Sequence, residues 1–275
     1  MAGILSVVAT PIGNLNDLSP RAAATLSDAD VIACEDTRVT RKLLTRAHSR
    51  AKLVAYHARN ERARVPELVR RVAAGEKVAL VTDAGTPGVS DPGQRLVAAC
   101  LDAGLRVEVV PGPSAALAAL VLSGMPTARF VFEGFLPRTA SARRRRLRAL
   151  AREERTIVLF ESPHRLAASL ADMRDTLGDR RAAMARELTK MHEEVVRARL
   201  SELVARAEDG VRGEVTLVIE GAAMEDGEPA GSDDIAAALR TLIADGVSKK
   251  DAIARVAADL NVAKKEVYKV AVETL

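Results

Sequence analysis

The first half of the chain alternates short apolar runs with stretches of helical periodicity. Apolar runs of this length between helices are typical of buried strands in a βαβ-type sheet. A helix is expected to begin at Ser19–Pro20, where a capping hydroxyl precedes a proline in the first turn. The Ala-rich stretch Ser114–Ser123 predicts a helix that packs closely on a sheet, because its side chains are small. The predicted strands are Ile4–Ala9, Val31–Cys34, Lys52–Ala55, Val78–Thr82 and Arg106–Val110.

A second unit begins after Ser123–Pro126, where glycine and proline interrupt the pattern. The pattern therefore predicts two α/β domains, residues 1–123 and 124–221. The predicted strands of the second domain are Phe130–Phe135, Thr156–Glu161, Arg181–Arg186, Glu193–Arg199 and Glu214–Glu220. Its predicted helices are Ser141–Arg152, Pro163–Leu177 and Leu200–Ala207.

The remaining residues form a linker and a helical appendage. Residues 222–232 are rich in glycine and acid and have no periodicity, which predicts a linker. Residues 233–275 contain three short helical patterns, of which the second starts after a capping Ser248 and ends near Leu260. A tight turn at Asn261–Val262 separates it from the third, an arrangement that resembles a helix-turn-helix. This appendage carries seven basic and seven acidic residues, so its charge alone does not favour a nucleic-acid partner over a packing role.

Composition excludes several protein classes. The chain has 275 residues, of which 48% are apolar and 28% charged, as in a globular protein. Its two cysteines, Cys34 and Cys100, form neither a disulfide framework nor a metal-binding spacing. No apolar run approaches the roughly 20 residues that span a bilayer, and no basic region precedes the first apolar stretch. We therefore expect a cytoplasmic protein without a membrane anchor.

One segment is strongly basic although the net charge is only +4. Residues 138–155 hold eight arginines and two glutamates, which is the electrostatic footprint expected for a phosphate-rich partner. A solvated helix face is the alternative explanation. Aromatic residues make up only 2% of the chain, so a nucleic acid would be recognised by shape and backbone more than by base stacking. The arginines expected to contact such a nucleic acid are Arg143, Arg144, Arg145, Arg146 and Arg148.

Polar loops, three of them rich in glycine and proline, follow four of the five strands predicted in the first domain. These loops are Ala9–Leu15, Glu35–Arg38, Asp83–Gly93 and Pro111–Ala115. In open α/β sheets, ligands bind beyond the carboxyl ends of the strands, so the four loops predict a single binding crevice. Glycine and proline are ordinary in turns, but the coincidence of polar loops at four equivalent ends argues for a site.

The residues in these loops narrow the choice of ligand. Neither the Walker A motif nor the dinucleotide fingerprint is present, which excludes a P-loop NTPase and argues against a dinucleotide. The longest loop offers Asp83, Thr86, Ser90 and Asp91, which suit a neutral or cationic ligand such as a sulfonium better than a polyphosphate. The histidines have no metal-ligand spacing, and neither a zincin helix nor a nucleophile elbow occurs. No metal is therefore expected.

Seven motifs in a fixed order make the interpretation specific. They are ATPIGNLNDLSPRA, ACEDTRVTRKLL, VTDAGTPGVSDPGQRLV, VVPGPSAALAALVLSGMP, FVFEGFLPR, LFESPHRL and ARELTKMHEEV, within residues 9–195. In this combination the chain resembles the bacterial small-subunit ribosomal RNA (cytidine-2′-O)-methyltransferase family of the tetrapyrrole-methylase (class III methyltransferase) superfamily. The helix-turn-helix-like end resembles that family's appendage, so the likeness covers nearly the whole chain.

The resemblance implies a fold, a cofactor and a substrate. It implies two α/β domains with S-adenosylmethionine between them, in a homodimer. The methyl group would go to a cytidine ribose 2′-hydroxyl in the decoding region of small-subunit rRNA, with the assembled small ribosomal subunit as the expected substrate. By motif position, the residues implied for the methyl donor are Pro11, Asp83, Gly85, Thr86, Pro87, Val89, Ser90, Pro111, Ser114 and Ala115, with Phe135 and Leu136 from the second domain.

Methyl transfer to a hydroxyl also requires a proton acceptor. In-line displacement depends mostly on near-attack geometry, and a carboxylate or lysine within hydrogen-bond reach would take the hydroxyl proton. The candidate catalytic residues are Asp36, Glu161, Glu187 and Lys190, and the sequence does not choose among them. Two other functions stay open: a methyltransferase of the same fold acting on a tetrapyrrole, and a non-catalytic RNA-binding assembly factor. The basic segment argues against the first alternative and the complete loops against the second.

Overall fold

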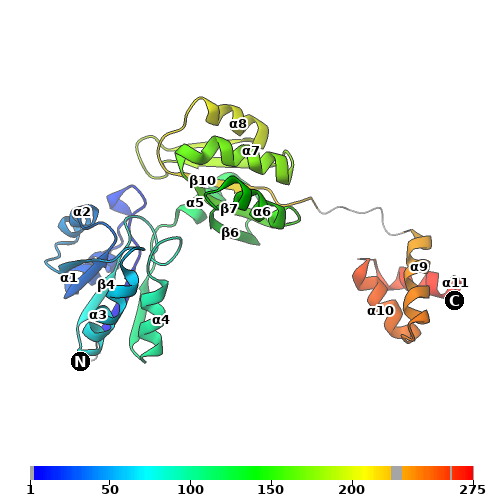
Figure 1. Ribbon diagram of the computed structural model, residues 1–275, viewed down its shortest axis with the longest axis horizontal. Helices are drawn as coiled ribbons and strands as arrows, with labels where there is room; N and C mark the ends of the chain where they lie inside the picture. The colour runs from blue at the N-terminus through cyan, green and yellow to red at the C-terminus, as the bar shows by residue number, and fades with distance from the viewer. Residues whose placement is uncertain (1–2, 224–230, 261, 275) are drawn as a thin grey trace. The chain divides into compact units, whose positions relative to one another are not determined.

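The computed structural model describes residues 3–223, 231–260 and 262–274. The chain divides into two compact units, residues 1–222 and residues 223–275. The first unit contains two β-sheets, which define two lobes, coloured blue to cyan and green to yellow in Figure 1. Most of the predicted linker, residues 224–230, lies outside the described residues, as does Asn261 of the predicted turn.

The first sheet is entirely parallel, with strand order β3-β2-β4-β1-β5. Its strands confirm the predicted ones to within two residues at either end. They are β1 (Ile4–Val8), β2 (Val31–Cys34), β3 (Lys52–Ala55), β4 (Lys77–Leu80) and β5 (Arg106–Val110). The helices of this lobe are α1 (Pro20–Asp28), α2 (Thr37–Ala47), α3 (Glu61–Ala73) and α4 (Gln94–Asp102), and a short 3-10 turn, η1 (Leu15–Asp17), precedes α1.

Helices cover both faces of the first sheet, so its central strands are buried on both sides, as a parallel sheet requires. Leu5, Val78 and Leu80 pack with residues of α3 and α4, whereas Val8, Ile32 and Val81 pack with residues of α1 and α2. The predicted start of α1 is confirmed. The Ser19 side chain accepts a hydrogen bond of 3.1 Å from the Ala22 amide, and Pro20 occupies the first turn.

The second sheet is mixed, with strand order β6-β7-β10-β8-β9. Only β6 and β7 are parallel, and the other neighbours are antiparallel. The strands are β6 (Phe130–Phe135), β7 (Thr156–Glu161), β8 (Arg181–Arg186), β9 (Glu194–Arg199) and β10 (Val215–Ile219). The helices are α6 (Ala140–Leu150), α7 (Leu166–Leu177) and α8 (Leu200–Glu208), with a 3-10 turn, η2 (Pro163–Arg165), before α7.

Helix α5 (Ala115–Ser123) packs on the second sheet although it follows β5 of the first. Ala116, Ala119 and Leu120 contact Val158 and Val218 within one buried cluster. Its small side chains allow the close approach that the Ala-rich sequence predicted. The predicted boundary after residue 123 assigns α5 to the first domain. In the structure this helix buries its apolar face in the second lobe.

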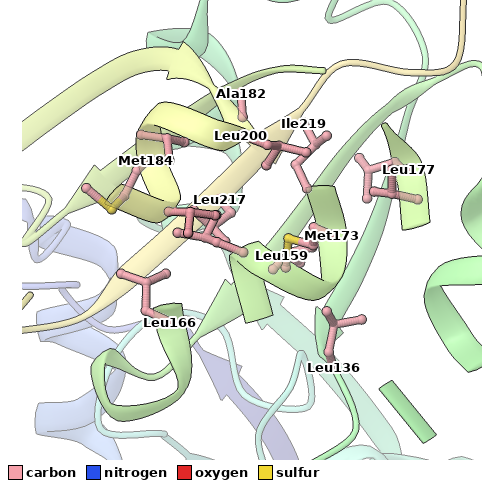
Figure 2. Packing of buried hydrophobic residues seen from close by; sticks show 14 of the residues in the cluster. Leu136, Leu159, Leu166, Met173, Leu177, Ala182, Met184, Leu200, Leu217 and Ile219 are labelled. Carbon is pink, nitrogen blue, oxygen red and sulfur yellow. The ribbon is translucent and has the colours of Figure 1, made fainter. Parts of the chain in front are cut away.

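The opposite face of the second sheet carries the largest apolar core of this lobe. Figure 2 shows Leu159 and Leu217 from the sheet packed near Leu166 and Met173 of α7. These four side chains are at most 1% exposed. Burying a side chain of this size contributes about 1.5–3 kcal/mol, so this cluster fixes α7 and α8 on the sheet.

The second unit consists of three helices around a core of their own. They are α9 (Ser232–Ala244), α10 (Lys249–Asp259) and α11 (Lys264–Thr274). Leu239, Val256 and Val267, one from each helix, are at most 1% exposed and lie in the same cluster. Ser248 caps α10 as predicted, with its hydroxyl accepting from the Asp251 amide at 3.2 Å.

Candidate functional site: a pocket lined by acids

Hydrogen bonds between loops bring the carboxyl ends of the parallel strands together. Thr10, after β1, and Gly85, after β4, form a two-way backbone bridge with N–O distances of 2.8 and 3.2 Å. The Asp36 amide, after β2, donates to Asp83 Oδ1 at 3.1 Å. The Ala9 amide donates to the carbonyl of Val110, at the end of β5, at 3.0 Å. The predicted convergence of the four loops is therefore present in the structure.

A pocket of about 410 Å³ opens beside these loops and is closed on the other side by the second lobe. This volume lies within the range of small-molecule sites. Phe160 and Phe135 form part of the wall, with ring centroids 5.6 Å apart. The lining comprises Ile12, Glu35, Thr82, Asp83, Ala84, Gly85, Thr86, Val89, Ser90, Asp91, Ser114, Ala115, Ala116, Phe135, Phe160, Glu161, Ser162, Pro163, Gly213, Glu214, Val215 and Thr216.

The Asp83–Gly93 loop has the backbone conformation that its glycines permit. Gly85 and Gly88 have φ of +84° and +83°, and Ser90 has φ of +65°, an uncommon value for a residue with a side chain. The loop also meets the second lobe closely. A Cβ on Gly134, which sits at a bulge in β6, would lie 3.0 Å from Ser90 Oγ. The glycines therefore allow backbone groups to form the pocket wall.

The structure brings eight of the twelve residues predicted for the methyl donor to the pocket and leaves four outside its lining. The eight are Asp83, Gly85, Thr86, Val89, Ser90, Ser114, Ala115 and Phe135. Pro11 and Pro87 are buried beneath the loops, and Pro111 is exposed. Leu136 differs most, because its side chain is 2% exposed and belongs to the apolar core of the second lobe. Its side chain packs against apolar neighbours and does not line the pocket.

Three pocket carboxylates, Glu35, Asp91 and Glu214, were not among the predicted donor-binding or catalytic residues, although Asp91 was named among the loop side chains that suit a cationic ligand. Thr82 Oγ1 donates to Asp91 Oδ2 at 2.8 Å and lies 3.4 Å from Glu35 Oε2. Burial raises the pKa of Asp91, and burial together with the nearby Asp91 and Asp83 raises the pKa of Glu35. Both residues stand in loops that follow strands. Glu35 is the first residue after β2, which was the available signal in the sequence.

The pocket is negative as a whole. Its lining contains five acidic residues, Glu35, Asp83, Asp91, Glu161 and Glu214, and no lysine, arginine or histidine. Burial also raises the pKa of Asp83, although a hydrogen bond from the Asp36 amide opposes the effect. A buried carboxylate has a raised pKa when neither water nor a nearby cation stabilises its negative charge. A cationic ligand would supply that stabilisation and therefore bind favourably.

Two of the predicted catalytic carboxylates are already engaged. Asp36 caps α2 outside the pocket lining, and hydrogen bonds from the Arg38 side chain and amide lower its pKa to about 2. Glu161 lies at the pocket wall, but its side chain is fully buried and accepts hydrogen bonds from the Ser162 amide, Arg165 and Ser169. Neither carboxylate is arranged to accept a further proton from a ligand.

Glu187 and Lys190 form an ion pair beside the pocket. Lys190 Nζ lies 2.8 Å from Glu187 Oε1 and 3.0 Å from Glu214 Oε2. The hydrogen bond from Lys190 and one from the Glu214 amide lower the pKa of Glu187. Burial disfavours the charge of Lys190, but its bonds to the two glutamates outweigh burial and raise its pKa. At neutral pH Lys190 is therefore a cation and a poor proton acceptor.

The predicted arginine cluster divides between the core and the surface. Arg143 is only 6% exposed and is paired with Asp172 at 2.6 Å, so the expectation that it faces RNA is wrong. A helix turns its residues to different sides, and position 143 falls on the face of α6 that packs against α7. Arg145 and Arg148 are exposed, whereas Arg144 and Arg146 are exposed but paired, Arg144 with Asp172 and Arg146 with Glu133.

The described residues contain neither a membrane-spanning helix nor a cluster of metal ligands. No helix in residues 3–223, 231–260 and 262–274 has the length and apolar character needed to cross a membrane. Within the same part of the chain, no group of three His, Cys, Asp or Glu side chains is placed to hold a metal ion.

Comparison with known proteins assigns this architecture. The family model of tetrapyrrole (corrin/porphyrin) methylases matches residues 5–204. The protein named ribosomal RNA small subunit methyltransferase I from Synechocystis is 46% identical over 273 residues, which covers 98% of each chain. The protein of the same name from Mycobacterium tuberculosis is 50% identical over 260 residues, or 94% of this chain and 90% of that protein.

Solved structures show the same fold. Uroporphyrin-III C-methyltransferase from Thermus thermophilus, solved in complex with S-adenosylhomocysteine, aligns with a TM-score of 0.57 and 25% identity over 79% of this chain and 97% of that one. Diphthine synthase aligns with a TM-score of 0.60 and 16% identity over 79% of this chain and 89% of that one. The chain therefore belongs to the tetrapyrrole methylase family and, within it, to the proteins named ribosomal RNA small subunit methyltransferase I.

Proposed function

We propose that this protein transfers the methyl group of S-adenosylmethionine to the 2′-hydroxyl of a cytidine ribose in small-subunit rRNA. The observation that carries the proposal is the acid-lined pocket at the converged strand ends, in a chain so similar to proteins named as methyltransferases of this RNA. The assembled small subunit is the proposed substrate, and the proposed location is the cytoplasm.

The residues of the pocket fit the methyl donor. When bound, S-adenosylmethionine supplies an electrophilic methyl group on a positively charged sulfur. The acidic lining favours that charge, and the loop around Gly85 and Ser90 presents backbone groups to polar parts of the ligand. Phe135 and Phe160 offer apolar surface for a flat ring. We assign the donor to Asp83, Gly85, Thr86, Val89, Ser90, Ser114, Ala115 and Phe135.

The Glu35–Asp91 pair is the proposed proton acceptor. Both side chains line the pocket, and each carboxylate has one oxygen that does not bond to Thr82. A general base works best when its pKa is close to the working pH, and burial moves both groups in that direction. Because the two carboxyls interact, they titrate as a pair. The paired Lys190 serves as a fixed cation at the pocket rim.

The exposed arginines of α6 are the proposed contact for RNA phosphates. Arg144, Arg145 and Arg148 lie outside the core, and Arg143 holds the helix in place through Asp172. Such contacts orient the RNA without reading its sequence. Target choice then depends on how the pocket admits one ribose of the folded RNA.

Methyl transfer to small subunits isolated from a strain lacking this protein tests the function. The wild-type protein should label the rRNA, and the labelled linkage should resist alkaline cleavage because its 2′-oxygen is blocked. Glu35→Gln and Asp91→Asn should each lower kcat by about 10²- to 10⁴-fold, the usual contribution of a general base. Asp36→Asn, which alters the neighbouring half-buried carboxylate outside the pocket lining, is the control and should stay within about threefold. Label in an alkali-sensitive linkage would contradict the ribose assignment.

Binding of S-adenosylmethionine should weaken as the pH falls. The raised pKa values of Glu35, Asp83 and Asp91 mean that these groups gain protons at a pH above the usual carboxyl range near 4. The cationic donor favours their ionised form, so its affinity is full above the raised pKa values and declines below them. Calorimetry between pH 7.5 and 5 should show a several-fold loss. S-adenosylhomocysteine, which lacks the sulfonium charge, should lose less, and equal losses would contradict the electrostatic explanation.

The combined variant Arg145→Gln/Arg148→Gln should bind rRNA more weakly and with a shallower dependence on salt, by about one unit of slope for each lost phosphate contact. Its melting temperature should not change. Arg143→Gln is the matched control. It should instead lower the free energy of unfolding by up to about 3 kcal/mol, because it leaves Asp172 less compensated. Unchanged RNA affinity in the combined variant would show that α6 does not contact RNA.

We also propose a homodimer, which the resemblance implies and an exposed apolar strip supports. Leu117 and Val121 lie one turn apart on α5 and are 52% and 71% exposed. Light scattering should give the mass of two chains. Leu117→Asp/Val121→Asp should give the mass of one chain at an unchanged melting temperature. A wild-type mass of one chain would contradict the proposal.

A further inference from the structure

The loop between β8 and β9, residues 187–193, is a rigid projection that we call the finger. Within it, the Lys190 amide donates to the Glu187 carbonyl at 3.0 Å, and the Thr189 amide donates to Glu193 Oε2 at 2.6 Å. Two further contacts fix its base. The Asn14 amide donates to Thr189 Oγ1 at 3.1 Å, and the Glu214 amide donates to Glu187 Oε1 at 2.9 Å.

The conformation of the finger is costly. Glu187 and Thr189 have φ of +52° and +65°, values that a branched residue such as threonine rarely adopts. Its neighbours on both sides must be glycine. A Cβ on Gly13 would lie 2.5 Å from Lys190 Cγ, and a Cβ on Gly213 would lie 2.5 Å from the Glu187 side chain. Backbone strain of this kind is maintained where the surrounding structure fixes it, and it concentrates at functional sites.

The tip of the finger presents an apolar side chain to solvent beside the pocket. Met191 is 94% exposed, the highest value among the large apolar side chains of the described chain. Ile12, Gly213 and Glu214, which neighbour the segments that hold the finger, line the pocket. Hence Met191 is carried by a loop whose supporting segments also contribute to the pocket wall.

One group near Met191 can pair with a phosphate. Glu187 is bonded to Lys190, and Glu193, although exposed, accepts a hydrogen bond from the Thr189 amide. Other exposed groups are Met191, His192 and, on the adjacent loop, Arg212. An apolar tip with an arginine on the adjacent loop suits a base and its phosphate.

We infer that the finger is a nucleotide-positioning element and that Met191 packs against an RNA base next to the ribose that is methylated. The inference rests on the proposed function. A base that leaves its stack needs a new apolar surface, and apolar wedges provide one in other nucleic-acid complexes. Methionine suits this role because its thioether is flexible and polarisable. The chain has few aromatic residues that could do the same.

Met191→Gln and Met191→Leu test this inference in the methyl-transfer assay with small ribosomal subunits. The Gln variant removes the apolar surface and should lower kcat/KM for the subunit about tenfold, the scale of losing one base contact. The Leu variant keeps that surface and should stay within about twofold. Affinity for S-adenosylmethionine and the melting temperature should match those of the wild type in both variants. Leu101→Gln, at an exposed apolar residue of α4 (57% exposed), is the control and should have no effect.

The outcomes separate the two proposals. A Gln variant within twofold of the wild type would overturn the role of Met191, as would equal losses in the Gln and Leu variants or an equal loss in Leu101→Gln. A loss accompanied by weaker donor binding would also overturn it, because the finger would then support the donor pocket. A wild-type protein that labels no rRNA would overturn the proposed function itself. Donor binding without labelling would still identify a methyltransferase pocket.

Discussion

The backbone bridge between Thr10 and Gly85 is the constraint on which the site depends. It joins the segments that leave β1 and β4, two adjacent strands at the centre of the parallel sheet. Beyond the last hydrogen bond of the sheet, the backbone of each segment has no partner in a neighbouring strand. The bridge supplies that partner and holds the two segments together. With the bridge in place, Asp83 reaches the Asp36 amide, and the loop beyond Gly85 turns toward the second lobe. The pocket therefore originates in main-chain bonds, and its side chains are arranged on that support.

The strands and helices were predictable because local and tertiary preferences agree. Buried strands such as Val31–Cys34 are continuous apolar runs, and α1 has an unambiguous start at Ser19. The assignment of α5 was less accessible. An Ala-rich helix can pack on either sheet, and only the tertiary contacts of Ala119 and Leu120 show that it packs on the second.

The site was predictable in position and less so in detail. Loops at strand ends identify a crevice, but they do not show which side chains are already bonded. Glu161 stands at the end of a strand, as a catalytic carboxylate would, yet Arg165 and Ser169 donate hydrogen bonds to its carboxylate. Arg143 stands in a basic run, yet Asp172 draws it into the core. Asp91 and Glu35 are far apart in the sequence, but both carboxylates lie beside the Thr82 hydroxyl. Such pairings depend on three-dimensional distance.

The position of α5 on the second sheet has a consequence for motion. The main chain passes from one lobe to the other at residues 111–114, immediately before that helix. Any opening of the two lobes must therefore pivot on a segment that contains Pro111 and Pro113 and that leads into the pocket at Ser114. Prolines stiffen a hinge, and a Cβ on Gly112 would come within 2.9 Å of Ala9. The pocket wall at Ser114 and the angle between the lobes are thus mechanically coupled.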